Sequence, residues 1–199
     1  DELADMCGVG SEVKEITMRA MNGELGFHDA LNERVSLLAQ CPSSIVEQVL
    51  EERITFRPGG KTLVSTMKAN GAYTALVSGG FTAFSIPIGT NLGFDEQHAN
   101  ILVEENGVFT GKVAEPILGK NEKVNQLNRL VKERGLMHSD VLAVGDGAND
   151  LGMLAIAGIG VAMHAKPIVA EKCDIVINHC DLSSLLYLQG YKKEDFVST

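Results

Sequence analysis

Apolar residues in the first quarter of the chain recur at the spacing of amphipathic helices. One stripe predicts a helix over residues 11–22, and a second predicts a helix from about residue 27 to 38. Ser44 and Glu47 have the spacing of a capping box, which predicts a third helix running to about Glu52. No strand pattern occurs before residue 54, so we expect residues 1–54 to form a small helical lobe. The two stripes are Val13, Ile16, Ala20 and Met21, and then Phe27, Leu31, Val35 and Leu38.

After residue 54 the pattern changes to short apolar runs that alternate with helical stretches. Such alternation is typical of a parallel sheet with helices on both faces, which is an α/β, Rossmann-like fold. We therefore expect residues 55–199 to form an α/β core. The expected strands are 73–77, 141–144, 159–163 and 174–177, and the expected helices are 60–69, 121–134, 149–157, 167–172 and one from Asp181 onward.

Two features interrupt this alternation. Asn106-Gly107 stands between residues 100–103 and 108–113, which predicts one β-hairpin. Pro87 and Gly89 fall within the helix expected after residue 80, and a proline there predicts a kink or a shortened helix. The sequence suggests no function for these two residues.

The composition is that of a globular protein and excludes several other classes. Of the 199 residues, 45% are hydrophobic and 22% are charged, which argues against disorder. The net charge of −9 argues against a nucleic-acid partner. No apolar run approaches the roughly 18 residues that cross a bilayer, and no signal peptide is expected. Four cysteines without a C-x-x-C pair predict reduced thiols and a cytoplasmic protein; they are Cys7, Cys41, Cys173 and Cys180.

Carboxylate and amide side chains gather in the segment Gly145-Asp146-Gly147-Ala148-Asn149-Asp150, directly after an expected strand. Ligands of parallel sheets bind at the carboxyl ends of the strands. Two aspartates at such a place suit Mg²⁺, with substrate phosphate and water as its other ligands. The five histidines have no zinc-binding spacing, which disfavours zinc. A turn with helix-capping Asp and Asn residues is the alternative for this segment.

Ser78-Gly79-Gly80 follows another expected strand and precedes a helix. A hydroxyl and backbone N–H groups at the start of a helix have the chemistry for binding a phosphate. An ordinary strand-to-helix turn, with Ser78 as the N-cap, explains the same residues.

Four further candidates have ordinary explanations when each is taken alone. Lys123 has the character of a solvated surface lysine, Arg34 that of a surface residue in an ion pair, and Met21 and Phe27 that of core residues. Composition alone also allows Lys120 in place of Lys123.

Taken together, these segments resemble the phosphoserine phosphatases of the haloacid dehalogenase superfamily, over essentially the whole chain. The resemblance implies that family's fold, with the helical lobe as a cap. It also implies a small-molecule substrate, O-phosphoserine, hydrolysed to serine and phosphate in the last step of serine biosynthesis. The segments that carry it are Val77-Ser78-Gly79-Gly80-Phe81, residues 143–151, Ala165-Lys166-Pro167, Ala20-Met21-Asn22-Gly23, Phe27, Arg34-Val35 and Lys123.

The resemblance also implies roles for individual residues. Ser78, the Gly79 amide and Lys123 would hold the phosphate, and Arg34 would bind the substrate carboxylate. Asp146 would ligate the metal directly, and Asn149 and Asp150 would complete or orient the metal's shell and position Lys123. The expected catalytic residues are Lys123, Asp146 and Asp150, and the expected metal ligands, for Mg²⁺, are Asp146 and Asp150. The expected substrate-binding residues are Met21, Phe27, Arg34, Ser78, Gly79, Lys123 and Asn149, of which Met21 and Phe27 would close over the substrate.

One part of the family pattern is absent from the sequence. No Asp-x-Asp motif occurs in the 199 residues, although the family uses that motif for its nucleophile and its general acid and base. In the family's fold the motif follows a central strand, between the strands that end at Ser78 and Gly145. We therefore expect these residues alone to be inactive, and the missing strand to be absent, disordered or supplied by another peptide. A non-catalytic phosphoserine- or phosphate-binding protein and a phosphatase with another small phosphoester substrate are the alternatives.

Overall fold

The computed structural model describes residues 2–119 and 121–197 and divides the chain into two compact units. The first unit contains the described residues 2–57 and 67–119, and the second contains 58–66 and 121–197. No helix within these ranges is long and apolar enough to cross a membrane.

Four helices open the first unit; the two apolar stripes predict the second and the third, the fourth is the helix expected to run to about Glu52, and the first was not among the predicted helices. They are α1 (Glu2–Met6), α2 (Gly10–Met21), α3 (Phe27–Ser36) and α4 (Ile45–Glu52). The predicted capping box at the start of α4 is wrong. Ser44 makes no capping hydrogen bond through its side chain, because its backbone is already helical, with φ −60° and ψ −16°.

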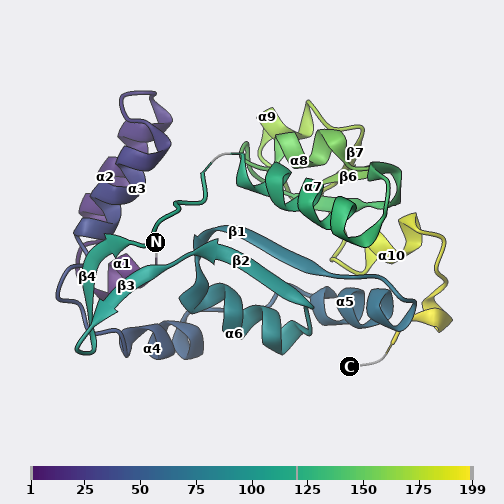
Figure 1. The fold of residues 1–199 in the computed structure, drawn as a ribbon. Helices are drawn as coiled ribbons and strands as arrows, with labels where there is room; N and C mark the ends of the chain where they lie inside the picture. Colours follow the sequence, from purple (N-terminus) through teal and green to yellow (C-terminus); the bar gives the residue numbers. More distant parts are fainter. Residues whose placement is uncertain (1, 120, 198–199) are drawn as a thin grey trace. The chain divides into compact units, whose positions relative to one another are not determined.

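Two small sheets complete the first unit (Figure 1). Strand β1 (Ala75–Phe81) pairs in parallel with β2 (Glu96–Asn100), and the connecting helix α6 (Thr82–Leu92) packs against both. Strands β3 (Leu102–Glu105) and β4 (Val108–Val113) form the predicted hairpin. Asn106 and Gly107 both have positive φ, 53° and 78°, which the tight turn between right-twisted strands requires.

Strand β2 and the course of α6 differ from the predictions. The apolar pattern misses β2 because its sequence, Glu-Gln-His-Ala-Asn, is mostly polar. Helix α6 is not shortened, since it runs to Leu92 with Pro87 inside it. A Cβ atom at Gly89 would overlap the side chain of Gln97, so this glycine lets α6 lie close to β2.

The four N-terminal helices share one hydrophobic core with the hairpin, so the helices and the hairpin belong to the same unit. The expected division into residues 1–54 and 55–199 therefore does not coincide with the two units. The buried members of this core are Leu3, Ala4, Val13, Leu31, Val35, Leu38, Val49, Leu102 and Phe109.

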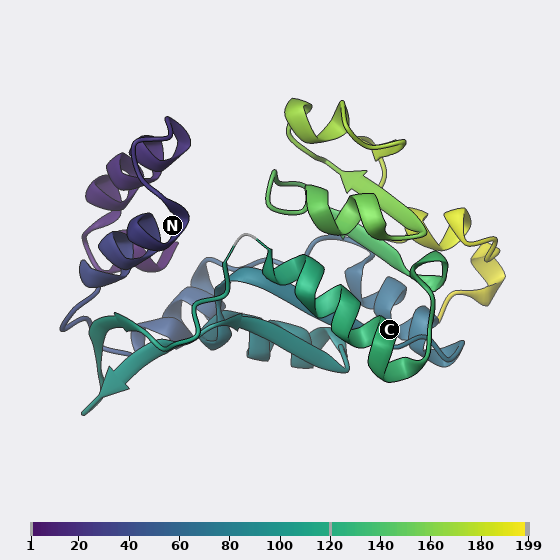
Figure 2. The ribbon, with the colours of Figure 1, turned by 45° about the horizontal axis from the view of Figure 1, so that its top comes forward.

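The second unit contains a three-stranded parallel sheet in the order β5-β6-β7 (Figure 2). Helix α8 packs against β5 and β6, and α7 packs against α8. Buried apolar residues of α7, α8, α9, β5 and β6 form its core. The elements are β5 (Leu142–Gly145), β6 (Ile159–Met163), β7 (Ile175–Ile177), α7 (Glu122–Arg134), α8 (Leu151–Ile156), α9 (Pro167–Ala170), α10 (Ser184–Leu188), and the 3-10 turns η1 (His138–Asp140) and η2 (Lys193–Asp195). Helix α5 (Gly60–Ala69) begins in this unit and ends in the first.

The parallel strands of the described residues form two sheets rather than one. β1 is hydrogen-bonded to β2 alone, and β5 to β6 alone, so neither has a described strand on its other edge. The additional strand expected between the strands that end at Ser78 and Gly145 stays a prediction.

Cys7 and Cys41 form a disulfide, so the prediction of reduced thiols is wrong for this pair. Their spacing of 34 residues gave no sign of it. The pairing follows from the fold, because Cys7 comes directly after α1, Cys41 precedes α4, and both side chains pack against the core of the first unit. Cys173 and Cys180 are free thiols.

Candidate active site

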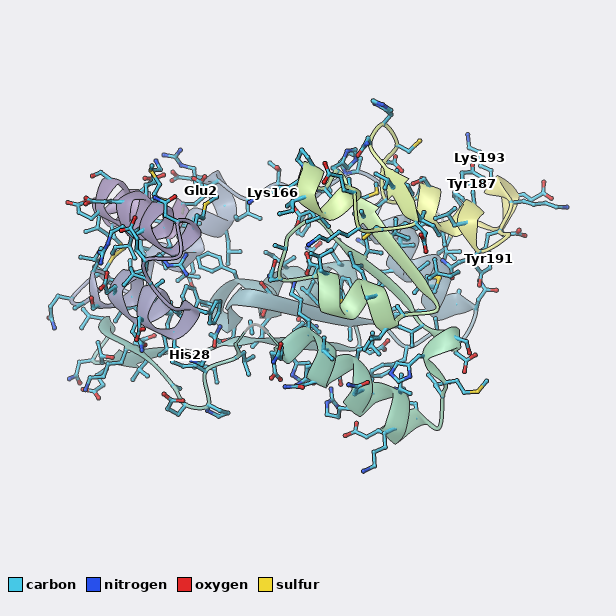
Figure 3. The ribbon with its side chains drawn as sticks, turned by 90° about the horizontal axis from the view of Figure 1, so that it is seen from above. Glu2, His28, Lys166, Tyr187, Tyr191 and Lys193 are labelled. Carbon is cyan, nitrogen blue, oxygen red and sulfur yellow. A yellow bond between two sulfur atoms is a disulfide. The ribbon has the colours of Figure 1, made fainter. Side chains whose placement is uncertain are left out.

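A cavity of about 570 Å³ in the first unit brings together residues that are far apart in the sequence. Arg34 of α3 and the segment Ser78-Gly79-Gly80 of β1 both line it. Most of the remaining lining is apolar, and Glu2, labelled in Figure 3, adds an acidic group. Two of the predicted substrate groups, the guanidinium and the Ser-Gly-Gly backbone, therefore share one cavity.

Arg34 offers a partly desolvated positive charge to this cavity. Its Nε donates a hydrogen bond to the carbonyl of Ala30 at 3.2 Å, and its guanidinium forms no ion pair with a described residue. Burial lowers the pKa of Arg34, because water is excluded from around the charge. A guanidinium in such a place is suited to bind a carboxylate through two parallel hydrogen bonds. The interpretation of Arg34 as a surface residue in an ion pair is therefore wrong.

Ser78, Gly79 and Gly80 form a bulge within β1 rather than a turn after it. Val77 pairs with His98 and Phe81 pairs with Asn100, so the three residues stand opposite Ala99 alone. A bulge of this kind takes backbone groups out of the ladder and redirects them. The N-cap position of α6 is occupied by Phe81, so the interpretation of Ser78 as an N-cap is wrong.

Two side-chain hydrogen bonds fix the bulge. The N–H of Gly80 donates to Ser78 Oγ at 3.0 Å, which leaves the hydroxyl hydrogen of Ser78 free to donate to a ligand. The carbonyl of Gly79 accepts a hydrogen bond from Nδ2 of Asn100 at 3.2 Å. Sequence reasoning missed Asn100, for which the available signal was a single amide residue directly before the apolar run Ile101-Leu102-Val103.

Met21 and Phe27 lie at the ends of α2 and α3 and do not line the cavity. They are 74% and 39% exposed, so the interpretation of them as core residues is wrong. Phe27 makes an edge-to-face contact with His28, labelled in Figure 3, with ring centroids 5.7 Å apart. Their closing over a substrate stays a prediction.

Asp150 organises the loop between β5 and α8 in the second unit. It is 2% exposed, and its Oδ2 accepts hydrogen bonds from the N–H groups of Asp146 at 3.0 Å and Gly147 at 2.9 Å. Its Oδ1 forms an ion pair with the ammonium group of Lys123 on α7. The carboxylate turns back into the loop and does not cap α8, so the helix-capping alternative is wrong for Asp150. The ion pair likewise shows that Lys123 is not a solvated surface lysine, and the alternative Lys120 lies outside the described residues.

Asp146 and Asn149 are exposed in the same loop, and neither side chain is hydrogen-bonded to a described residue. A Cβ atom at Gly145 would overlap the side chain of Asp150, so this glycine lets the loop close tightly around the buried carboxylate. The carbonyl of Asp146 accepts a hydrogen bond from the N–H of Lys166, labelled in Figure 3, at 3.2 Å.

This loop fits a Mg²⁺ ion through the carboxylate of Asp146. Mg²⁺ prefers oxygen ligands and is often bound by one or two carboxylates together with water and phosphate. Both oxygens of Asp150 are already used by protein donors. Since the described residues contain no group of three or more His, Cys, Asp or Glu that could hold a metal, other ligands must complete the coordination.

A family model described as haloacid dehalogenase-like hydrolase matches residues 8–155. The chain therefore belongs to this family, in agreement with its α/β architecture and with the aspartate loop after β5.

Several similar proteins within the family are described as phosphoserine phosphatases. The one from Streptococcus thermophilus is 45% identical over 186 residues, which cover 94% of this chain and 86% of that protein. The one from Streptomyces coelicolor is 41% identical over 188 residues, which cover 94% of this chain and 46% of that protein, so this chain spans about half of its length. A solved structure described as a substrate-bound phosphoserine phosphatase complex has a TM-score of 0.85 at 41% identity and covers 94% of this chain and 89% of that one. These likenesses confirm the predicted fold.

Proposed function

We propose that this chain functions in a phosphoserine phosphatase, which hydrolyses O-phosphoserine to serine and phosphate. The observation that carries the proposal is the cavity lined by both Arg34 and the Ser78-Gly79-Gly80 bulge. A guanidinium binds a carboxylate, whereas a free hydroxyl and backbone N–H groups bind phosphate oxygens. One cavity with both kinds of group fits a small molecule that carries a carboxylate and a phosphate. The substrate-bound relative is described as a phosphoserine phosphatase complex, which supports this substrate class.

The proposed roles follow from the chemistry of each group. Ser78 and the Gly79 amide bind the phosphate, and Lys123 neutralises its negative charge, as phosphoryl transfer requires. Asp150 positions Lys123 through their ion pair. Asn149 orients neighbouring groups of the loop. Closure over the substrate is the proposed role of Met21 and Phe27.

Magnesium is the proposed cofactor, and Asp146 is its proposed direct ligand. The ion supplies positive charge to the phosphate oxygens when it is bound. Asp150, the second ligand expected from the sequence, acts on the metal through the backbone of the loop that it holds.

The proposed reaction also needs an aspartate nucleophile that becomes phosphorylated. No Asp-x-Asp motif occurs in the 199 residues. We assign the nucleophile to residues outside this sequence, on the same chain or on an associated peptide. The 199 residues alone then bind the substrate without turnover. The cytoplasm, where the product serine is used in biosynthesis, is the proposed location; this proposal rests on the substrate and not on the cysteines, because Cys7 and Cys41 form a disulfide.

Titration calorimetry with the 199-residue chain tests the substrate class. O-phospho-L-serine should bind at least about tenfold more tightly than inorganic phosphate or L-serine, because it alone engages both groups of the cavity. Phenyl phosphate, which has no carboxylate, should bind like inorganic phosphate. Equal affinities for O-phospho-L-serine and phenyl phosphate would contradict the proposed substrate.

A further inference from the structure

Asn100 is a buried amide at the end of β2 that links two backbone segments of the first unit. It is 1% exposed, although it is one of the most polar side chains in that unit's interior. Its Nδ2 donates to the carbonyl of Gly79 at 3.2 Å, and its Oδ1 accepts from the N–H of Leu118 at 2.7 Å. A buried amide is costly unless it is hydrogen-bonded, so both partners are needed to hold it there.

We propose that Asn100 is a positioning residue that sets the orientation of the phosphate-binding bulge. The proposal rests on the function proposed above. It assigns the specific task of fixing the peptide between Gly79 and Gly80 to a side chain that does not line the cavity.

The bulge itself creates the need for such a residue. Ser78, Gly79 and Gly80 face Ala99 alone, so Gly79 is not among the residues paired with β2. Glycine restricts its own backbone less than any other residue. The side-chain amide of Asn100 therefore gives the carbonyl of Gly79 the kind of hydrogen bond that pairing with β2 gives to the backbone elsewhere along β1.

The planarity of the peptide bond carries this constraint to the ligand groups. The carbonyl of Gly79 and the N–H of Gly80 belong to one rigid plane and point in opposite directions. With the carbonyl held by Asn100, the N–H of Gly80 is directed to Ser78 Oγ, where it donates at 3.0 Å. Because Ser78 Oγ accepts that bond, its own hydrogen is directed away from the bulge and is free for a phosphate oxygen.

The side-chain oxygen of Asn100 connects the bulge to the segment that follows the hairpin, through a hydrogen bond with Leu118. Leu118 lies after β4 and before α7 in the sequence, in a segment without helix or strand. Its N–H finds its acceptor in Oδ1 of Asn100. An aspartate at position 100 would keep this acceptor but could not donate to Gly79 when ionised.

The test compares Asn100→Asp with Thr66→Val, a change that also removes a hydrogen-bonding group from a fully buried polar residue. Thr66 is 0% exposed and accepts a hydrogen bond from the N–H of Val197 in the second unit. We expect Asn100→Asp to lower the affinity for O-phospho-L-serine and for inorganic phosphate by about tenfold. The same change should speed hydrogen exchange at the Gly80 amide by a similar factor. Thr66→Val should lower the melting temperature and leave both affinities and the Gly80 exchange rate unchanged.

Each outcome decides for or against the proposal. A folded Asn100→Asp protein with wild-type Gly80 exchange overturns it, as does wild-type phosphate affinity in that variant. If the wild-type chain binds neither ligand, the proposed function fails, while the Gly80 exchange comparison still tests the positioning role. If Asn100→Asp does not fold, exchange of the Asn100 side-chain amide is measured in the wild-type chain. Added phosphate should slow that exchange severalfold, and an unchanged rate overturns the proposal.

Discussion

The ammonium group of Lys123 on α7 forms an ion pair with Asp150, the residue directly before α8. Their side chains are only 16% and 3% exposed. The same carboxylate accepts hydrogen bonds from the backbone of Asp146 and Gly147. Lys123 and Asp146 are the residues to which we assign contacts with phosphate and metal, so one buried carboxylate controls the placement of both.

Asp150→Asn should therefore destabilise the protein as well as impair ligand binding. Removing one partner of a buried ion pair leaves the other charge uncompensated, which costs about 3 kcal/mol in the free energy of unfolding. Urea denaturation measures this loss. The control is Glu133→Gln, which removes the exposed i,i+4 pair with Arg129 and should cost less than about 0.5 kcal/mol. Equal losses in the two variants would contradict the structural role of Asp150.

Arg34→Ala should weaken binding of O-phospho-L-serine by about tenfold or more, because the substrate carboxylate loses its partner. Binding of phenyl phosphate should change little. Arg19→Ala provides the control, since Arg19 forms a partly exposed pair with Glu33 at 3.0 Å and does not line the cavity. Calorimetry with both ligands checks the result. A similar loss of affinity for both ligands would contradict the carboxylate-binding role of Arg34.

Protonation of Asp95 should contribute to the loss of the protein's stability against unfolding as the pH is lowered. Partial burial acts to raise the pKa of Asp95, but hydrogen bonds from Lys68 and from the backbone and hydroxyl of Thr74 lower it below its usual value overall. A carboxyl whose pKa is depressed by folding stabilises the protein above the unfolded-state pKa of about 3.9. That contribution is lost as the pH falls through the folded-state pKa. Thermal unfolding between about pH 2 and 6 should show a shallower acid loss in Asp95→Asn than in the wild type, and identical profiles would refute this assignment.

Reduction of the Cys7–Cys41 disulfide should lower the stability of the first unit. The bond closes a loop of 34 residues, and in the chain-entropy description such a loop contributes about 4 kcal/mol. Thermal unfolding with and without dithiothreitol measures the effect. The double variant Cys7→Ser, Cys41→Ser should unfold at the lower temperature under both conditions. A wild-type melting temperature that does not respond to the reductant would show that the bond is not formed in solution.

The apolar periodicity predicted most elements, because burial on one face leaves a direct trace in the sequence. The stripes of α2 and α3 and the apolar runs of β5 and β6 are examples. Strand β2 left no such trace, since its sequence is mostly polar and one of its two buried residues is Asn100, whose burial depends on partners elsewhere in the chain. The Asn106-Gly107 turn was readable because its backbone conformation requires these residue types locally.

The residue types of the site could be predicted from the sequence, but their arrangement in space could not. The Ser-Gly-Gly and aspartate segments were recognisable from their residues, yet the bulge at Ser78–Gly80 depends on register with β2. The resemblance distinguished Asp146, as the direct metal ligand, from Asp150, which would complete or orient the metal's shell and position Lys123. The burial of Asp150 in hydrogen bonds and the exposure of Asp146 became visible only in the structure. The Cys7–Cys41 bond likewise depends on how α1 and α4 pack.

Phosphate release from O-phospho-L-serine in the presence of Mg²⁺ tests the central claim most directly. The assay compares the 199-residue chain with a version extended at its N-terminus by a strand that ends in Asp-x-Asp, and with the same extension carrying Asn at the first Asp. We predict turnover by the intact extension alone, with loss of turnover when Asp146→Asn or Lys123→Met is added. Equal hydrolysis by the unextended chain, or none by the intact extension although it binds O-phospho-L-serine, would contradict the proposed enzyme and favour a non-catalytic binding protein.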